Sequence, residues 1–429
     1  MNEKIEKFGG FLGRKVEKHP RAVAKTLSAV YRGIGLQARR FPNKDLPASR
    51  EFGQGYTARV LSEMLARPEG TAVVNIFTSC EIFHALDIPV LAPEALALYI
   101  TNTAIEQPFV QAAQAAGASE NLCSFHRCLM GLAETGVLRS PMLVTNTTLA
   151  CDANQLTFRR LAEVWDVPHF VVEVPYRTDE TAVAYVAEQM RELAVLTERQ
   201  AGRKLSGEKL REAVTHSVRT QEWFRKYLEI RSAVHLPEAM TPELLNVINN
   251  HLYLGSAHGE AYAKMLFEDA MKAPGIGKAP RILWMHILPN AQEPLKVIFQ
   301  GADNHRVEIV GCDIAFDNLV KMDPDRPYEA MARRIVESNY NGSGARRIER
   351  TLDWAKKLKA DGVLIFCQWG CKQTQGLAFT AKKAFEEAGL PTLVLDGDAC
   401  DRTNEASGQA ATRASAFVEE LWSLKEAAR

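Results

Sequence analysis

The stretch Gly362-Val-Leu-Ile-Phe-Cys-Gln-Trp-Gly-Cys371 is the clearest guide to the fold. It begins with an apolar run that is rich in β-branched and aromatic residues and too short for a helix, which predicts a buried strand over 362–366. A helical pattern follows near 373–388, so the chain passes from strand to helix within a few residues. Strands that lead directly into helices are the repeating unit of α/β folds with parallel sheets.

The same alternation of strands and helices occurs in two parts of the chain. Buried strands are expected upstream at 71–78, 142–147 and 169–174, and downstream at 281–287, 307–310, 362–366 and 392–395. Residues 178–273 between these parts are expected to be almost continuously helical, with Thr241 and Pro242 marking a helix start. The composition of residues 273–280 is typical of a linker.

These patterns predict an α/β protein with two Rossmann- or flavodoxin-like parallel-sheet domains. Two domains also suit a chain of 429 residues, which is too long for one ordinary core. The predicted parts are, in order, an N-terminal helical arm, a first α/β domain, a helical connecting region and a second α/β domain, at residues 1–55, 56–177, 178–275 and 276–429.

Composition and charge exclude several classes of protein. The 52 basic and 52 acidic residues balance, whereas a general nucleic-acid binder has a clear basic excess. No apolar run reaches the roughly 18 residues needed to span a membrane, and the N-terminus lacks the apolar segment of a signal peptide. We therefore expect a cytoplasmic protein without nucleic-acid or membrane partners.

The N-terminal arm is basic and amphipathic. Residues 1–41 hold ten basic residues against three acidic ones, and apolar side chains recur at helical spacing at Val23, Leu27, Val30 and Tyr31. Such an arm either docks to an acidic partner or lies on its own protein with the basic face in solvent, and the second outcome is the commoner one.

The eight cysteines point to chemistry. In a reducing cytoplasm they are not expected to form disulfides, so they are either buried apolar residues or metal ligands. Four of them lie just past the carboxyl ends of predicted strands, namely Cys80, Cys151, Cys367 and Cys400. Loops converge at that edge of a parallel sheet, and the helix N-termini that follow favour thiolates and anionic clusters.

Two more cysteines, Cys123 and Cys371, lie in connections close to the same edges. Together the six form one triple in each domain, namely Cys80/Cys123/Cys151 and Cys367/Cys371/Cys400. Three thiolates per iron–sulfur cubane leave one iron open to a substrate or a bridging sulfide. A structural zinc site is the alternative, but its usual Cys-x₂-Cys pairs are missing.

Six stretches between residues 77 and 404 follow a known pattern: Phe77-Thr-Ser-Cys-Glu-Ile, Cys123-Ser-Phe-His-Arg, Thr147-Thr-Leu-Ala-Cys-Asp152, Val174-Pro-Tyr-Arg177, Cys367-Gln-Trp-Gly-Cys-Lys-Gln-Thr374 and Asp396-Gly-Asp-Ala-Cys-Asp-Arg-Thr-Asn404. Through them the chain closely resembles the superfamily of 2-hydroxyacyl-CoA dehydratases and benzoyl-CoA reductases, which includes the 2-hydroxyglutaryl-CoA dehydratase D-component family. The last two stretches are the most specific part of the resemblance.

The resemblance implies a cofactor and partners. In the dehydratases, each of two different subunits is similar to half of this arrangement and holds one [4Fe-4S] cubane through three cysteines. A single chain with both triples resembles the double-cubane cluster branch, which implies an [8Fe-9S] cluster of two sulfide-bridged cubanes and a homodimer. It also implies a separate ATP-hydrolysing [4Fe-4S] activator protein as electron donor, and this chain has no Gly-x₄-Gly-Lys-Ser/Thr loop of its own.

Three functions are compatible with these residues. The first is an iron–sulfur reductase that depends on ATP through its activator and reduces a small-molecule substrate at a double-cubane cluster. The alternative is a 2-hydroxyacyl-CoA dehydratase or acyl-CoA reductase component with one or two separate [4Fe-4S] clusters. A non-catalytic iron–sulfur electron carrier is the third. No motif identifies the substrate.

Three polar residues beside the ligand cysteines are candidates for catalysis. His126, close to Cys123, either donates protons or hydrogen bonds to the cluster or holds its loop through backbone contacts, as does its neighbour Arg127. Lys372 and Gln373 lead into the helix after Cys371, where they either orient a substrate or form a solvated first turn.

Other residues near the motifs have ordinary explanations as well as functional ones. Cys128 falls on a helix and is expected to pack, whereas Cys312 follows a strand and competes as a ligand, although the family pattern does not require it. Asp396 and Asp398 occupy positions of metal ligands, but turn formation and helix capping explain them. Gly342-Ser-Gly-Ala-Arg-Arg347 opens a helix and either cradles a phosphate of coenzyme A or a nucleotide, or caps that helix.

Overall fold

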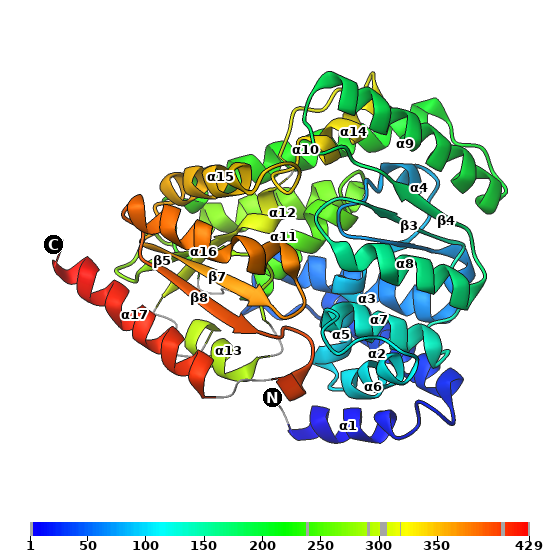
Figure 1. The fold of residues 1–429 in the computed structure, drawn as a ribbon, viewed down its shortest axis with the longest axis horizontal. Coiled ribbons are helices and arrows are strands. Elements are labelled where there is room, and N and C mark those ends of the chain that lie inside the picture. Colours follow the sequence, from blue (N-terminus) through cyan, green and yellow to red (C-terminus); the bar gives the residue numbers. More distant parts are fainter. Residues whose placement is uncertain are drawn as a thin grey trace.

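Two parallel sheets of four strands each form the centre of the molecule, which confirms the predicted α/β class (Figure 1). The structure is a computed structural model that describes residues 3–236, 240–289, 292–300, 307–317, 319–404 and 408–427. The first sheet has the order β2-β1-β3-β4 and contains β1 (Ala72–Val74), β2 (Val90–Leu91), β3 (Leu143–Thr147) and β4 (His169–Val172). The second has the order β6-β5-β7-β8 and contains β5 (Arg281–Met285), β6 (Glu308–Cys312), β7 (Gly362–Gln368) and β8 (Thr392–Gly397).

The two sheets have the same topology. In each, the first strand pairs with the second on one side and with the third on the other, and all pairings are parallel. The chain therefore reverses its direction of winding between β1 and β3, and again between β5 and β7, and ligands of open α/β sheets bind at such points. Every residue of β7 is buried, as its apolar sequence predicts.

The second sheet is covered by helices on both faces (Figure 1). Helices α15 (Gly344–Lys357) and α16 (Lys372–Glu387) lie over one face, and α13 (Glu293–Gln300) and α17 (Gln409–Ala427) over the other. Helix α14 (Pro327–Val336) belongs to the same part of the sequence but packs against α9, far upstream in the chain. The two halves of the protein are therefore interleaved through α14.

The first sheet is surrounded by shorter helices. These are α4 (Glu81–Ala85), α5 (Pro93–Asn102), α6 (Glu106–Ala115), α7 (Ser124–Glu134) and α8 (Asp152–Trp165). Helix α8 packs against β3 and β4, and α7 packs against α8. The strand β2 was not predicted, because its two residues are too few to give a periodic pattern.

The N-terminal arm contains α1 (Glu3–Gly13) and α2 (Pro20–Arg40), and α3 (Ala48–Ala66) runs across its predicted end at residue 55. Helix α2 lies along α3 and buries the apolar stripe that includes Val23, Leu27 and Tyr31. The arm thus lies on its own protein.

Four helices make up the connecting region: α9 (Glu180–Ala201), α10 (Gly207–Arg231), α11 (Met240–Leu252) and α12 (Ala257–Lys272). Gly202 ends α9 in a left-handed conformation, and the side chains of Ser206 and Ser256 cap the starts of α10 and α12. Thr241 and Pro242 lie in the first turn of α11 that the structure describes.

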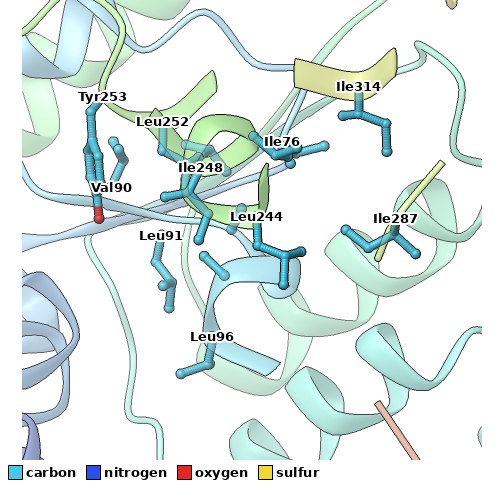
Figure 2. Close-up of a cluster of buried hydrophobic side chains, with 14 of the residues drawn as sticks. Ile76, Val90, Leu91, Leu96, Leu244, Ile248, Leu252, Tyr253, Ile287 and Ile314 are labelled. Carbon is cyan, nitrogen blue, oxygen red and sulfur yellow. The ribbon is translucent and has the colours of Figure 1, made fainter. Parts of the chain in front are cut away.

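Apolar side chains from both sheets meet around α11. Figure 2 shows Ile76, which follows β1, and Ile287 and Ile314, which follow β5 and β6, gathered with Leu244 and Ile248 of α11. This cluster brings the carboxyl ends of the two sheets toward each other. Across the described ranges, each helix is too short or too polar to cross a membrane.

Candidate active site between the two sheets

A cavity of about 290 Å³ lies where the carboxyl ends of the two sheets meet. Its walls come from the loops after β1 and β3 on one side, including Phe77 and Ala150, and from the loops after β5 and β7 on the other, including His286 and Gly370. Most of the lining is apolar, with a few polar side chains among it. A largely apolar, two-sided cavity at the switch points of parallel sheets is typical of a small-molecule or cofactor site.

Three of the predicted ligand cysteines, Cys123, Cys151 and Cys371, line this cavity. Each is the residue immediately before a helix, namely α7, α8 and α16. The unpaired N–H groups and positive dipole end of a helix N-terminus stabilise thiolates and anionic groups. The cavity therefore combines two members of the first predicted triple with one member of the second.

Close contact between the two domains depends on Gly370. Its φ is +81°, and a Cβ atom on it would lie 2.6 Å from the backbone nitrogen of Cys123 and 2.7 Å from the carbonyl oxygen of Asn121. Only glycine fits there. Ala150 and His286 also have positive φ, +62° and +81°, without being glycine. Such strained backbone is retained where surrounding structure enforces it, commonly at functional sites.

Burial keeps the thiols of Cys123 and Cys151 protonated in the iron-free protein. It raises the pKa of Cys123 well above its ordinary value, with Cys151 and Cys371 adding to the effect. It likewise raises the pKa of Cys151 to about 12, with further contributions from Glu94 and Cys371. Because thiolates are the form that binds iron, loading a cluster here must release protons.

His126 occupies the cavity beside Cys151. Its Nε2 lies 3.5 Å from Cys151 Sγ, and its buried Nδ1 has no hydrogen-bond partner among the described residues. Burial lowers the pKa of His126 to about 4, so the imidazole is neutral at neutral pH. A neutral histidine with one unpaired ring nitrogen can donate a hydrogen bond to a bound molecule or accept one from it.

Two further polar groups of the cavity, Glu94 and His286, were not predicted. Burial raises the pKa of Glu94 to about 7, and Glu94 Oε2 lacks a hydrogen-bond partner within the described part of the chain. Burial, together with Arg347, lowers the pKa of His286 well below its ordinary value. His286 directly follows β5, so the strand-end rule used for the cysteines would have found it. Glu94 looks like an ordinary acid in the first turn of α5.

The other two predicted polar residues also lie at the cavity. Lys372 is at its rim, largely exposed, with Nζ 3.4 Å from a carboxylate oxygen of Asp152. This pair joins α16 of the second domain to α8 of the first. Gln373 is part of the wall, and its Oε1 accepts a hydrogen bond of 2.5 Å from Arg347 Nη1.

The remaining predicted ligands are buried away from the cavity wall. The Cys80 thiol donates to the carbonyl of Thr78 at 3.4 Å, and Cys367 packs in an apolar cluster beneath α16. Cys400 lies beside Cys128 of α7, across the domain interface, and this neighbour together with burial raises the pKa of Cys400 well above its ordinary value. Their assignment as cluster ligands stays a prediction. Cys312 donates to the carbonyl of His286 at 3.1 Å.

The three cavity thiols surround a space and do not converge on one point. Over the described ranges, no three histidine, cysteine, aspartate or glutamate side chains are arranged to hold a single metal ion. A cubane has its thiolate ligands around a body of several iron and sulfur atoms, each ligand on a different iron. The arrangement of Cys123, Cys151 and Cys371 around the cavity fits such a group.

The motif after β8 joins the two domains. Asp398 Oδ1 accepts hydrogen bonds from the Ser124 hydroxyl of α7, from Gln368 Nε2 at 3.2 Å and from the backbone of Cys400 at 2.9 Å. Arg127 of α7 lies 3.8 Å from Asp398 and 3.6 Å from Asp401. We call these buried side chains, Ser124, Arg127, Gln368, Asp398 and Asp401, the interdomain latch. Asp396, two residues before, is exposed.

Comparison with known proteins agrees with the sequence motifs. The family model for 2-hydroxyglutaryl-CoA dehydratase, D-component, matches residues 75–421. The (R)-phenyllactyl-CoA dehydratase alpha subunit of Clostridium sporogenes is 22% identical over 373 residues, 81% of this chain and 88% of its own. The beta subunit of that name is 25% identical over 295 residues, 66% of this chain and 75% of its own.

Similarity also extends to the lactoyl-CoA dehydratase subunit alpha of Anaerotignum propionicum, which is 24% identical over 410 residues, 86% of this chain and 94% of its own. The superfamily resemblance is therefore confirmed, whereas the double-cubane branch stays a prediction. The chain resembles alpha and beta subunits to a similar degree.

Proposed function

Because the chain belongs to the 2-hydroxyglutaryl-CoA dehydratase D-component family of enzymes, we propose that it is a cluster-binding dehydratase component that acts on a 2-hydroxyacyl thioester of coenzyme A. The names of the relatives all describe acyl-CoA dehydratase subunits. The observation that supports this most directly is that three thiols from both domains line one largely apolar cavity.

In this proposal Cys123, Cys151 and Cys371 hold a [4Fe-4S] cluster. When bound, the cluster supplies one-electron chemistry and one iron without a protein ligand. The residues fit such a group, because each thiol lies at a helix N-terminus and the buried Nδ1 of His126 has no partner in the described part of the chain.

The other cavity residues provide a dry site with protons at hand. Apolar side chains such as Phe77 and Ile287 exclude water, which strengthens every polar interaction with a bound acyl group. Glu94, whose pKa of about 7 matches neutral pH, is suited to give or take a proton. Neutral His126 is suited to hydrogen-bond a substrate oxygen, and Lys372 and Gln373 are suited to orient the thioester at the rim.

The proposal includes partners. We infer that a separate ATP-hydrolysing iron–sulfur activator delivers the electron, because no phosphate-binding Gly-x₄-Gly-Lys-Ser/Thr loop is present in this chain. Its relatives are named as alpha or beta subunits, which supports assembly with a second subunit or a second copy.

A double-cubane reductase of small molecules is the second candidate. It is favoured by one observation, the presence of six motif cysteines in a single chain that resembles alpha and beta subunits alike. It would also need Cys80, Cys367 and Cys400 as ligands, and these do not line the cavity.

Anaerobic reconstitution of the full chain with iron and sulfide separates the two candidates. A single cubane gives about four irons per chain, and a double cubane about eight. Calorimetric titration with coenzyme A and with a 2-hydroxyacyl thioester then tests the substrate class. About four irons with thioester binding supports the proposal. About eight irons without thioester binding supports the second candidate, and an iron-free chain contradicts both.

A further inference from the structure

A buried arginine lies directly behind the Cys371 side of the cavity. Arg347 of α15 is 1% exposed, and its guanidinium is held on several sides. Nε donates to Asp313 Oδ2 at 2.7 Å, and Nη1 donates to Gln373 Oε1 at 2.5 Å and to Thr374 Oγ1 at 3.2 Å. The guanidinium carbon also lies 4.2 Å from the centre of the Tyr340 ring.

These contacts connect Arg347 to three parts of the cavity wall. Gln373 and Tyr340 line the cavity themselves. Asp313, the ion-pair partner, accepts a hydrogen bond of 2.7 Å from the backbone nitrogen of His286, another wall residue. Gln373 and Thr374 lie two and three residues after Cys371 in the first turn of α16. The charge of Arg347 is therefore fixed close to Cys371 by residues from separate elements.

One end of this guanidinium is unpaired. Arg347 Nη2 is buried and has no hydrogen-bond partner within the described ranges. Leaving a charged donor unsatisfied in a buried position is costly, because water is lost and nothing replaces it. An arginine cannot relieve this cost by losing its proton. A negative charge held nearby, as at Cys371, would lower this cost through its attraction to the guanidinium.

The neighbouring Arg346 does not share this property. Its Nη1 donates to the carbonyl oxygen of Asn341 at 2.7 Å, and its Nη2 donates to that of Glu337 at 3.3 Å. Arg346 therefore holds together the loop that precedes α15. This pattern favours a structural role over phosphate binding for the segment 342–347 and leaves Arg347 as its buried cation.

We propose that Arg347 is a positioning residue whose fixed positive charge stabilises the negative charge held at Cys371. The inference rests on the proposed cluster, and it makes Arg347 a determinant of how readily that cluster accepts an electron. Reduction adds a negative charge, and a nearby buried cation favours the more negative state. Asp313 opposes this effect, so the two residues shift the reduction potential in opposite directions.

A redox titration of the reconstituted full chain, without substrate, tests this. Arg347→Gln should lower the midpoint potential by a tenfold change in the one-electron equilibrium, which is about 59 mV. Arg347→Lys, which keeps the charge, should restore most of it. Asp313→Asn removes the opposing charge and should shift the potential upward.

Arg350→Gln is the matched control, because Arg350 is exposed on the same helix, one turn away. It should leave the potential unchanged, since water screens an exposed charge. Opposite shifts for Arg347→Gln and Asp313→Asn support the inference, since general damage to the site would not reverse sign. If Arg347→Gln fails to fold, an upward shift in Asp313→Asn still supports it.

An unchanged potential in both variants, or equal shifts of the same sign, would overturn the inference while leaving the proposed function intact. Sign-reversed shifts in a protein that turns over no acyl thioester would instead remove the proposed function and leave the role of Arg347 standing. An iron-free wild-type chain would remove both.

Discussion

The two sheets share one strand order, yet their carboxyl edges contribute different things to the cavity. The edge of the first sheet supplies two thiols, Cys123 and Cys151, with neutral His126 beside them. The edge of the second supplies one thiol, Cys371, with the buried cation Arg347 behind it. The second edge also supplies the carboxylates of the interdomain latch.

The difference shows that two sheets of the same topology can contribute different functional groups to one site. Parallel strands bring loops to one edge in both halves, but the direction of each side chain is decided within the loop. In the first half the loops present thiols. In the second half, the polar residues of the interdomain latch contact the first half, and Arg347 places a buried positive charge behind Cys371. The following experiments test this division, starting with the largest expected effect.

Removal of a cavity thiol should have the largest effect. Cys123→Ser, Cys151→Ser and Cys371→Ser should each lose most of the iron after anaerobic reconstitution, because a cubane needs its thiolate ligands. Cys128→Ala should keep full iron content, since Cys128 is a buried packing residue of α7. Iron and sulfide analysis with Mössbauer spectroscopy gives the readout.

The variants Cys367→Ser and Cys400→Ser test whether the second sheet edge contributes fewer ligand thiols than the first. If the second edge contributes only Cys371, both variants retain the iron of the wild type. If they lose as much iron as Cys123→Ser, the two edges share ligation equally and the double-cubane candidate gains support.

Loss of the interdomain latch should have the next largest effect. Asp398→Ala leaves buried Arg127 with Asp401 as its remaining carboxylate partner and removes the acceptor of the hydrogen bonds from Ser124 and Gln368. Leaving a buried donor without its acceptor costs about 1–3 kcal/mol of unfolding free energy for each group. Urea denaturation of the iron-free protein measures this cost. Asp396→Ala, an exposed control, should stay within about 0.5 kcal/mol of wild type.

Substitution of Gly370, where the two domains approach closely, should cause a smaller loss of stability. Gly370→Ala combines an unfavourable positive φ with overlap against Cys123, and such overlap costs about 1–3 kcal/mol beyond the backbone strain. Gly389 has the same backbone conformation, φ +82°, but open space around its Cα. Gly389→Ala should therefore cost only the strain, about 1–2 kcal/mol. Equal losses in the two variants would mean that the domains do not touch at Gly370 in solution.

The smallest effect concerns the pH dependence of stability. Glu94 has a raised pKa in the folded protein, so its contribution to stability is full below pH 4.5 and is lost as the pH rises through about 7. His126 has a lowered pKa, so its contribution is full above pH 6.5 and is lost as the pH falls through about 4. The two dependences have opposite sign over an overlapping range.

Relative to wild type, Glu94→Gln should therefore gain stability as the pH rises from 5 to 8, and His126→Gln should gain it as the pH falls from 7 to 4. Each difference should reach about 2 kcal/mol in the iron-free protein. Chemical denaturation at a series of pH values measures both. Differences of the same sign would show that the two groups are not buried as described.

The sequence predicted the fold well because its signals are local. Buried runs such as 362–366 specify strands, and only β2, with two residues, fell below the length at which a pattern exists among the described strands. The strand-end rule also led to Cys151, and the connections beside the strand ends led to Cys123 and Cys371; all three line the cavity.

The same rule could not predict which thiols face the cavity. Cys80, Cys367 and Cys400 also lie at strand ends, but they are buried elsewhere, because the backbone of each loop decides the direction of its side chains. Positive φ values at Ala150 and Gly370, which directly precede two of the cavity cysteines, leave no periodic signature in the sequence. Arg347 was singled out only as part of a possible phosphate loop, since its burial depends on Asp313 and Tyr340, which are contacts of the folded chain.

Because both domains contribute to the three cavity thiols, the set becomes complete only late in the synthesis of the chain. Cys123 and Cys151 emerge early during synthesis, whereas Cys371 follows only after the connecting helices and most of the second sheet have been made. Until the Gly370 loop settles against Asn121 and Cys123, the cavity has only two of its three thiols. A nascent or truncated chain is therefore unable to complete the set, and under the proposed function only a finished, closed chain would hold a cluster.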